Sequence, residues 1–354
     1  MRRILIIILT LALFLIAAGC STLSQPDTNA RPLEIYFLDM VGGGSTLIVT
    51  PLGESVLIDT GSREPMHRDV DRICRACKDA GVEHIDYLIT THFHTDHFGG
   101  ILELSKRIPI RRFIDKGVPP PPHEQNTDWF RDLYPLYVQA TKGQTQALRA
   151  GDDIPLKNDP TGAIPPIRLH CVAAEKLIDG FDGDIDAPVA GFEPKEPDTT
   201  DNARSIALVL TYGRFKFFAG GDITSNVEHH LTHPVNRIGK VDLYQVTHHG
   251  LDQSNNPLLL EALSPTVCVA MNGPKKGIQP RTFRDLKTLP SVKAIYQIHY
   301  NTQYGDEGNT SPEFIANSDD PQEGRYIKAA VHSQKAAFEV SIDSAGPTNT
   351  YKIQ

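Results

Sequence analysis

Three histidines and an aspartate fall within six residues of each other, in the segment His92-Phe93-His94-Thr95-Asp96-His97. They directly follow residues 85–90, an apolar run with the pattern of a buried β-strand. Neutral imidazole and carboxylate suit Zn²⁺ and similar divalent ions, and histidines at this density are costly to pack unless something coordinates them. The segment therefore predicts a metal site at the end of a strand, with His92, His94, Asp96 and His97 as ligands.

Three other short segments contain residues of the same chemistry. They read Ile58-Asp59-Thr60-Gly61, Gly220-Gly221-Asp222 and Val246-Thr247-His248-His249-Gly250. Together with the histidine segment, they resemble the successive motifs of the metallo-β-lactamase superfamily, over about residues 33–342. The resemblance implies an α+β fold of four layers, an αββα sandwich, and a hydrolase that uses divalent metal ions.

Within that superfamily, the sequence is most similar to the branch that contains the hydrolase domains of DNA-uptake competence proteins and the phosphorylcholine esterases. Three segments resemble that branch: Leu38-Asp39 with Val41-Gly42-Gly43-Gly44, the strand Asn202-Ala203-Arg204-Ser205, and the pair His248-His249 before Gly250. The first segment departs from the branch, because glycine stands where the branch has glutamine and Ser45 replaces an acid. The likeness favours a phosphodiester substrate.

The family scheme also implies the role of each ligand. His92 and His94 would bind a first metal ion, whereas Asp96, His97 and one of His248 or His249 would bind a second. Asp222 would bind both ions, which are expected to be Zn²⁺, with Mn²⁺ as the alternative. Asp59 and Asn202 would contact these ligands and orient them without binding an ion themselves. A carboxylate that accepts the distal N–H of a ligating histidine fixes the orientation of its ring, although Asp59 could instead only cap the end of its strand.

Many members of the superfamily supply a third histidine to the first metal ion. At that position this sequence has Asp201-Asn202, while His170 lies inside an expected strand and His123 in an expected insertion. The first ion should therefore have fewer protein ligands, which leaves a coordination position for water or substrate.

Two divalent ions bridged by one carboxylate bring the pKa of a shared water close to neutrality, so the expected nucleophile is a bridging hydroxide. Asp96 and Asp222 would then take part in catalysis as metal ligands. The remaining histidine of the pair, taken as His249 with His248 as the ligand, would hydrogen-bond an oxyanion or protonate the leaving group. Packing behind the site is the alternative role for His249.

Three functions remain open from the sequence. They are the hydrolysis of a phosphodiester, the hydrolysis of a carboxylic ester, lactone or β-lactam, and non-catalytic binding by a protein that kept the fold. Lys275 and Lys276 follow an expected strand and could contact a substrate anion or lie solvated on the surface. The formal net charge is −8 and no stretch concentrates Lys and Arg, so long nucleic acid is not a favoured substrate.

The N-terminus has the pattern of a targeting segment. Arg2 and Arg3 precede an apolar run at residues 4–18 that is short for a membrane span. It ends in Ala17-Ala18-Gly19-Cys20, which resembles the lipobox of bacterial lipoproteins, except that Ala17 replaces the usual leucine. We expect a signal peptide at 1–19, acylation of Cys20, a flexible tether at 20–32, and an exported protein anchored in the cell membrane or outer membrane. A simple signal anchor is the alternative, and no protein partner can be inferred.

The elements that must position the motifs are short strands and helices that alternate in both halves of residues 33–345. Strands are expected at 33–39, 45–50, 55–60, 85–90, 112–115, 167–172, 205–211, 215–219, 241–246, 266–271, 294–298, 328–332 and 337–342. Helices are expected at 69–80, 129–146, 224–231, 258–263 and 282–289. This pattern predicts two packed sheets with helices outside them.

Two segments interrupt or follow this pattern. An insertion at about residues 117–150 begins with the proline run 119–122 and could form a lid or substrate wall that carries His123 and Trp129. Residues 346–354 are expected to be a C-terminal tail. Cys74 and Cys77 fall on an expected helix, which favours packing or a local disulfide over a redox motif.

Overall fold

The structure is a computed structural model, and it describes residues 31–63, 66–187, 195–317, 324–344 and 346–354. The expected signal peptide, Cys20 and all but two residues of the tether lie outside the described residues. Within them, no helix has both the length and the apolar character needed to cross a bilayer.

The first sheet has nine strands in the order β18-β17-β16-β1-β2-β3-β4-β5-β6. Pairing is antiparallel from β18 to β3 and parallel from β3 to β6. The strands are β1 (Leu33–Phe37), β2 (Thr46–Val49), β3 (Ser55–Ile58), β4 (Ile85–Ile89), β5 (Ile110–Asp115), β6 (Gln146–Ala147), β16 (Ile327–Val331), β17 (Ala337–Ile342) and β18 (Thr348–Lys352).

The second sheet also has nine strands. Eight run in the order β15-β14-β13-β12-β11-β10-β8-β7, and β9 pairs with β8. Here β7 to β11 pair antiparallel and β11 to β15 parallel. The strands are β7 (Asp153–Ile154), β8 (Ile167–Ala174), β9 (Leu177–Ile178), β10 (Ala207–Tyr212), β11 (Phe215–Ala219), β12 (Leu243–Gln245), β13 (Val267–Ala270), β14 (Ala294–His299) and β15 (Ile315–Asn317).

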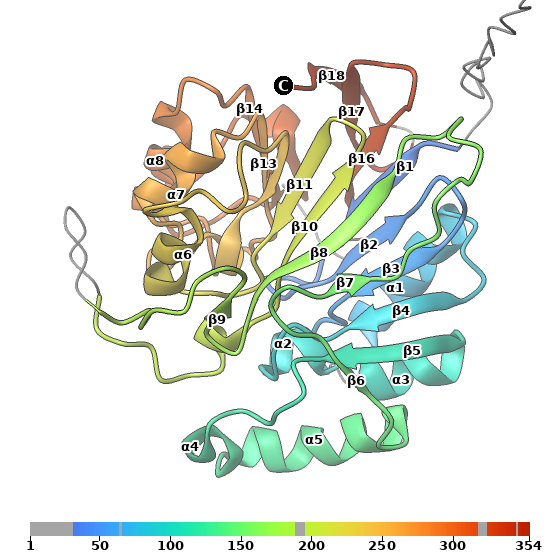
Figure 1. The fold of residues 1–354 in the computed structure, drawn as a ribbon, viewed down its shortest axis with the longest axis vertical. Helices are drawn as coiled ribbons and strands as arrows, with labels where there is room; N and C mark the ends of the chain where they lie inside the picture. The colour runs from blue at the N-terminus through green and yellow to red at the C-terminus, as the bar shows by residue number, and fades with distance from the viewer. Residues whose placement is uncertain (1–30, 64–65, 188–194, 318–323, 345) are drawn as a thin grey trace, which may run out of the picture.

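Helices cover the outer face of each sheet (Figure 1). Against the first sheet pack α1 (Arg68–Asp79), α3 (Ile101–Arg107) and α5 (Asp128–Thr141). Against the second sheet pack α6 (Ser225–Thr232), α7 (Pro257–Leu263) and α8 (Pro280–Thr288). The short helices are α2 (Thr95–Phe98), α4 (Pro122–Gln125), η1 (Asn202–Arg204), η2 (Thr247–Gly250), η3 (Gly305–Glu307) and η4 (Pro312–Phe314).

The inner faces of the two sheets share one apolar core. Ile35 and Phe37 of β1 are fully buried in it with Leu208 and Phe217 of the second sheet. The rings of Phe37 and Phe217 meet edge to face at 5.8 Å between centroids, a favoured aromatic geometry. Helix, sheet, sheet and helix form four layers, which confirms the predicted αββα sandwich.

Several elements differ from their predicted bounds. Helix α5 ends at Thr141, five residues before the predicted end, because Lys142 adopts the left-handed conformation (φ 54°) and Gly143 (φ 66°) continues the turn. The segment predicted as a C-terminal tail contains β18, whose Tyr351 pairs with Phe338 of β17. The first sheet thus extends past residue 345. Cys74 and Cys77 lie on α1 without a disulfide.

Candidate metal centre

The histidine segment follows the carboxyl end of β4. His92 and His94 lie in the loop, and Asp96 and His97 lie on α2. The Nε2 of His92 and the Nδ1 of His94 are 3.2 Å apart. Two ligand-type nitrogens from different rings therefore face one another, as they do around a shared ion.

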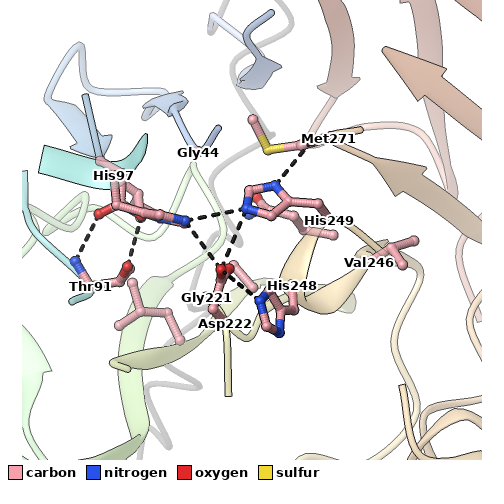
Figure 2. Close-up of a pocket in the computed structure, with 14 residues that line it drawn as sticks. Gly44, Thr91, His97, Gly221, Asp222, Val246, His248, His249 and Met271 are labelled. Atoms are coloured by element: carbon pink, nitrogen blue, oxygen red, sulfur yellow. Dashed lines mark hydrogen bonds and ion pairs between the residues drawn. The ribbon is translucent and has the colours of Figure 1, made fainter. Parts of the chain in front are cut away.

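Asp222 lies at the centre of the imidazoles. It follows β11, and its Oδ2 is 3.3 Å from the Nε2 of His97 and 4.0 Å from the Nε2 of His92. The Nε2 atoms of His248 and His249, on η2 after β12, are both 3.4 Å from the same oxygen. Figure 2 shows His97, His248 and His249 converging on Asp222 from segments that follow strands of both sheets.

Asp96 forms a second point of convergence. Its Oδ2 is 3.5 Å from the Nε2 of His97, 3.4 Å from the Nε2 of His249 and 2.5 Å from the Nζ of Lys276. Two groups of three residues are spaced to hold an ion: His92, His97 and Asp222, and Asp96, His97 and His249. They share His97, so two positions lie next to each other.

The donor set fits the divalent ions that the superfamily motifs imply. The Nε2 atoms of His97 and His249 are 3.3 Å apart, and both rings are buried. The buried Oδ1 of Asn202 has no hydrogen-bond partner among the described residues. Buried polar atoms are rarely left unpaired, and the converging imidazoles and carboxylates match what a cation would require.

Carboxylates and imidazoles shift one another's pKa values throughout the site. Burial lowers the pKa of His97, but Asp222, Asp96 and Asp59 outweigh it and hold that pKa well above its usual value. Burial raises the pKa values of Asp96 and Asp222, but the neighbouring histidines hold both well below the usual range. Burial also lowers the pKa of His248 to about 4. The carboxylates are therefore ionised, the state in which they ligate metals, whereas His97 carries a proton that a bound ion would have to displace.

Asp59 lies behind His97. Its Oδ2 is 2.8 Å from the Nδ1 of His97 and accepts from the Thr91 hydroxyl, while its Oδ1 accepts from the Thr91 amide. Gly44 makes room for this pair, because a Cβ there would lie 2.8 Å from the Nδ1 of His97. Asp59 thus contacts the nitrogen of His97 that faces away from Asp222.

The backbone is strained where it presents the paired histidines. His248 and His249 both adopt positive φ, 53° and 55°, a conformation that costs about 1–3 kcal/mol for each non-glycine residue. The His248 amide donates to the Gly221 carbonyl, and the His249 carbonyl accepts from the Ile278 amide. These bonds hold a turn that directs both imidazoles at Asp222.

Asp201 and Asn202 are the residues that, by the resemblance described above, stand where many members of the superfamily have a third histidine. Asp201 is fully buried, accepts from the Phe93 amide at 2.8 Å and pairs with Lys116 at 3.0 Å. It therefore fixes the backbone between His92 and His94. The Nδ2 of Asn202 lies 3.4 Å from the Nε2 of His248.

The other candidate histidines lie elsewhere. His170, on β8, contacts Asp153 and Asp179, and His123 is exposed on α4. Sequence reasoning missed Glu124, next to His123, whose Oε1 is 2.9 Å from the Nε2 of His94. Thirty residues separate the two, so no local spacing links them. Trp129 from the same insertion packs edge-on against His94, with the ring centroids 5.7 Å apart.

Comparison with known proteins agrees with this fold and site. Residues 39–267 match the family model described as the metallo-beta-lactamase superfamily, which covers well over half of the chain. The chain therefore belongs to the metallo-β-lactamase superfamily. No curated protein matches it.

Similar solved structures are distant. One, titled a metal-dependent hydrolase of Parabacteroides distasonis, is 14% identical with a TM-score of 0.37, over 73% of this chain and 96% of that one. Another is CmlA, a diiron β-hydroxylase of Streptomyces venezuelae, 14% identical with a TM-score of 0.35, over 68% of this chain and 44% of that one. Similarity at this level does not bear on activity.

Proposed function

We propose that this protein is a hydrolase that uses two divalent metal ions and acts on a phosphodiester. The observation that carries the proposal is Asp222, whose Oδ2 lies within 3.4 Å of three imidazole nitrogens, from His97, His248 and His249. A carboxylate so surrounded is placed to bind two adjacent ions. When bound, such a pair supplies a nucleophilic water at neutral pH and clamps the oxygens of the reacting group.

The distances refine the ligand assignment within this proposal. His92 and His94 would hold the first ion, and Asp96, His97 and His249 the second, with Asp222 between them. The described residues group His249, rather than His248, with Asp96 and His97. His248 contacts Asp222 and the side chains of Gln253 and Ser254. We therefore exchange the roles expected from the sequence: His249 is the ligand, and His248 is the neutral imidazole that hydrogen-bonds next to it.

Lys276 favours an anionic reacting group. Its ammonium lies 2.5 Å from the Oδ2 of Asp96, and its side chain is 39% exposed, so a partly exposed cation adjoins the second metal position. A phosphodiester carries its negative charge on the group that reacts, whereas a neutral ester or lactone does not. The likeness of the Asn202 and His248-His249 segments to phosphodiester-cleaving proteins favours the same substrate.

The test loads the purified protein with Zn²⁺ or Mn²⁺, measures bound metal by elemental analysis, and compares initial rates on a chromogenic phosphodiester, a lactone and a β-lactam. We expect up to two equivalents of metal and the highest rate on the phosphodiester. Hydrolysis of the lactone or β-lactam alone would overturn the substrate class. Retention of far less than one equivalent would overturn the metal site.

We also propose that the protein is exported and anchored through Cys20, on the sequence pattern alone. Cys20→Ala should move the protein from the membrane fraction to the soluble fraction, because one acyl chain alone holds a protein only marginally and several chains are expected on this cysteine. Fractionation with immunoblotting measures this. Wild-type protein that is entirely soluble would contradict the anchor.

A further inference from the structure

Glu124 is a buried carboxylate on α4, within the insertion that interrupts the superfamily pattern. Only 7% of the residue is exposed, although its neighbours Pro122 and His123 are exposed. A carboxylate is seldom buried without partners that satisfy it. Its two oxygens make two different contacts, and both lead to the metal centre.

One oxygen contacts a metal-ligand candidate directly. The Oε1 of Glu124 is 2.9 Å from the Nε2 of His94, while the Nδ1 of the same ring faces the Nε2 of His92 at 3.2 Å. The two nitrogens of His94 are thus divided, with Nδ1 toward the ligand cluster and Nε2 toward Glu124. A carboxylate on the far nitrogen fixes the tautomer and the ring orientation of a ligating histidine and raises its basicity.

The other oxygen ties the insertion to the segment that replaces the third histidine. The Oε2 of Glu124 accepts from the Asp201 amide at 3.0 Å. Asp201 in turn accepts from the Phe93 amide, and Lys116 balances its charge. Glu124 therefore joins the side chain of His94 to the residues that fix the backbone on either side of Phe93.

We infer that Glu124 is a positioning residue for the first metal ion, through which the insertion becomes part of the metal centre. Its carboxylate holds the His94 ring with Nδ1 available for the ion, and Trp129 of the same insertion packs edge-on against that ring. A site with few protein ligands depends strongly on the orientation of each one. The inference rests on the metal pair proposed above.

The test measures metal affinity rather than activity. Zn²⁺ is titrated against a chromogenic chelator for the wild type, Glu124→Gln, Glu124→Ala and Asp128→Asn, the last an exposed carboxylate at the start of α5 in the same insertion. We expect one of two equivalents to bind about 10–100-fold more weakly in Glu124→Ala. Glu124→Gln, which keeps an acceptor but loses the charge, should fall between, and Asp128→Asn should match the wild type.

Hydrogen exchange gives a second readout. Adding Zn²⁺ to the wild type should slow amide exchange in α4 and α5, and Glu124→Gln should lose much of that protection, because the ion is then uncoupled from the insertion. A wild type that binds no metal would refute the proposed function itself. A wild type that binds two ions, with Glu124→Gln and Glu124→Ala equal to it in affinity and protection, would refute the role of Glu124.

Discussion

Two segments of this protein are equally rich in histidine but differ in what lies between the rings. His92, His94 and His97 surround carboxylates, and the pKa of His97 is raised by Asp222, Asp96 and Asp59 against the effect of burial. On and beyond α6, His229 instead stacks on His233, with the ring centroids 5.3 Å apart, and burial lowers the pKa of His229 to about 4. Among the described residues, only the first segment belongs to a metal-type group.

The difference teaches that histidine density alone does not define a metal site. The imidazoles of α6 serve as flat, neutral packing groups, and His230 stacks on Phe181 at 4.5 Å between centroids. What distinguishes the site is an ionised oxygen between the nitrogens. The most informative experiments therefore remove carboxylates and histidines separately.

Removing the central carboxylate should have the largest effect. Asp222→Ala should lower the hydrolytic rate by several orders of magnitude, because the imidazoles lose the oxygen that they share and the proposed metal pair would lose its bridge. Steady-state kinetics on the metal-loaded protein measure this, with circular dichroism to establish that the fold survives. Wild-type rates in this variant would contradict the proposed mechanism.

Replacing one histidine in each segment by alanine tests directly whether only the segment with carboxylates between its rings binds metal. His97→Ala should reduce bound metal by at least one equivalent, because both groups of ligands contain His97. His233→Ala, in the other segment, should leave the metal content unchanged. Elemental analysis of the two variants, prepared alike, gives the result, and equal losses would show that the carboxylates are not the deciding feature.

A smaller effect is expected from Asp59, which contacts the Nδ1 of the ligand candidate His97. Asp59→Asn should weaken binding of the second ion about 10–100-fold, because the amide cannot hold the Nδ1 proton of His97 as the carboxylate does. Competition with a chelator measures the affinity. An unchanged affinity would reduce Asp59 to a cap of its strand, the alternative that the sequence left open.

The smallest effect should come from Lys276, the partly exposed residue that pairs with Asp96. Lys276→Ala should raise KM for a phosphodiester by about tenfold, a loss typical of a partly exposed charge contact, and should change turnover of a neutral lactone little. Lys275→Ala provides a matched control, since Lys275 is the exposed neighbour. If both variants behave alike on both substrates, Lys276 does not contact the anion.

The sequence predicts those parts of the site in which several ligand-type residues lie close together in one short segment. Residues 92–97 place four ligand candidates after one strand, so their grouping can be read directly. Asp222 and the pair at 248–249 were found through resemblance. Which of the pair faces Asp96 could not be read, because it depends on two consecutive left-handed residues.

Glu124 was missed for a related reason. It lies 30 residues from His94 and 77 from Asp201, and its segment looked like a proline-rich surface loop. The fold shows the same limit. Strand and helix patterns predict the layers, whereas β18 is polar except for Tyr351 and has no alternating pattern that predicts a strand. Contacts made across long sequence separations by ordinary polar residues leave no local pattern.

The pairing of β1 with β16 sets the order in which the chain can fold. Leu33 pairs with Val331, so one edge of the first strand stays unpaired until a segment about 300 residues further along the chain has emerged. All the ligand candidates, up to residue 249, have by then been made. A nascent chain can thus hold a complete set of metal-binding side chains while an apolar strand edge remains open to other chains.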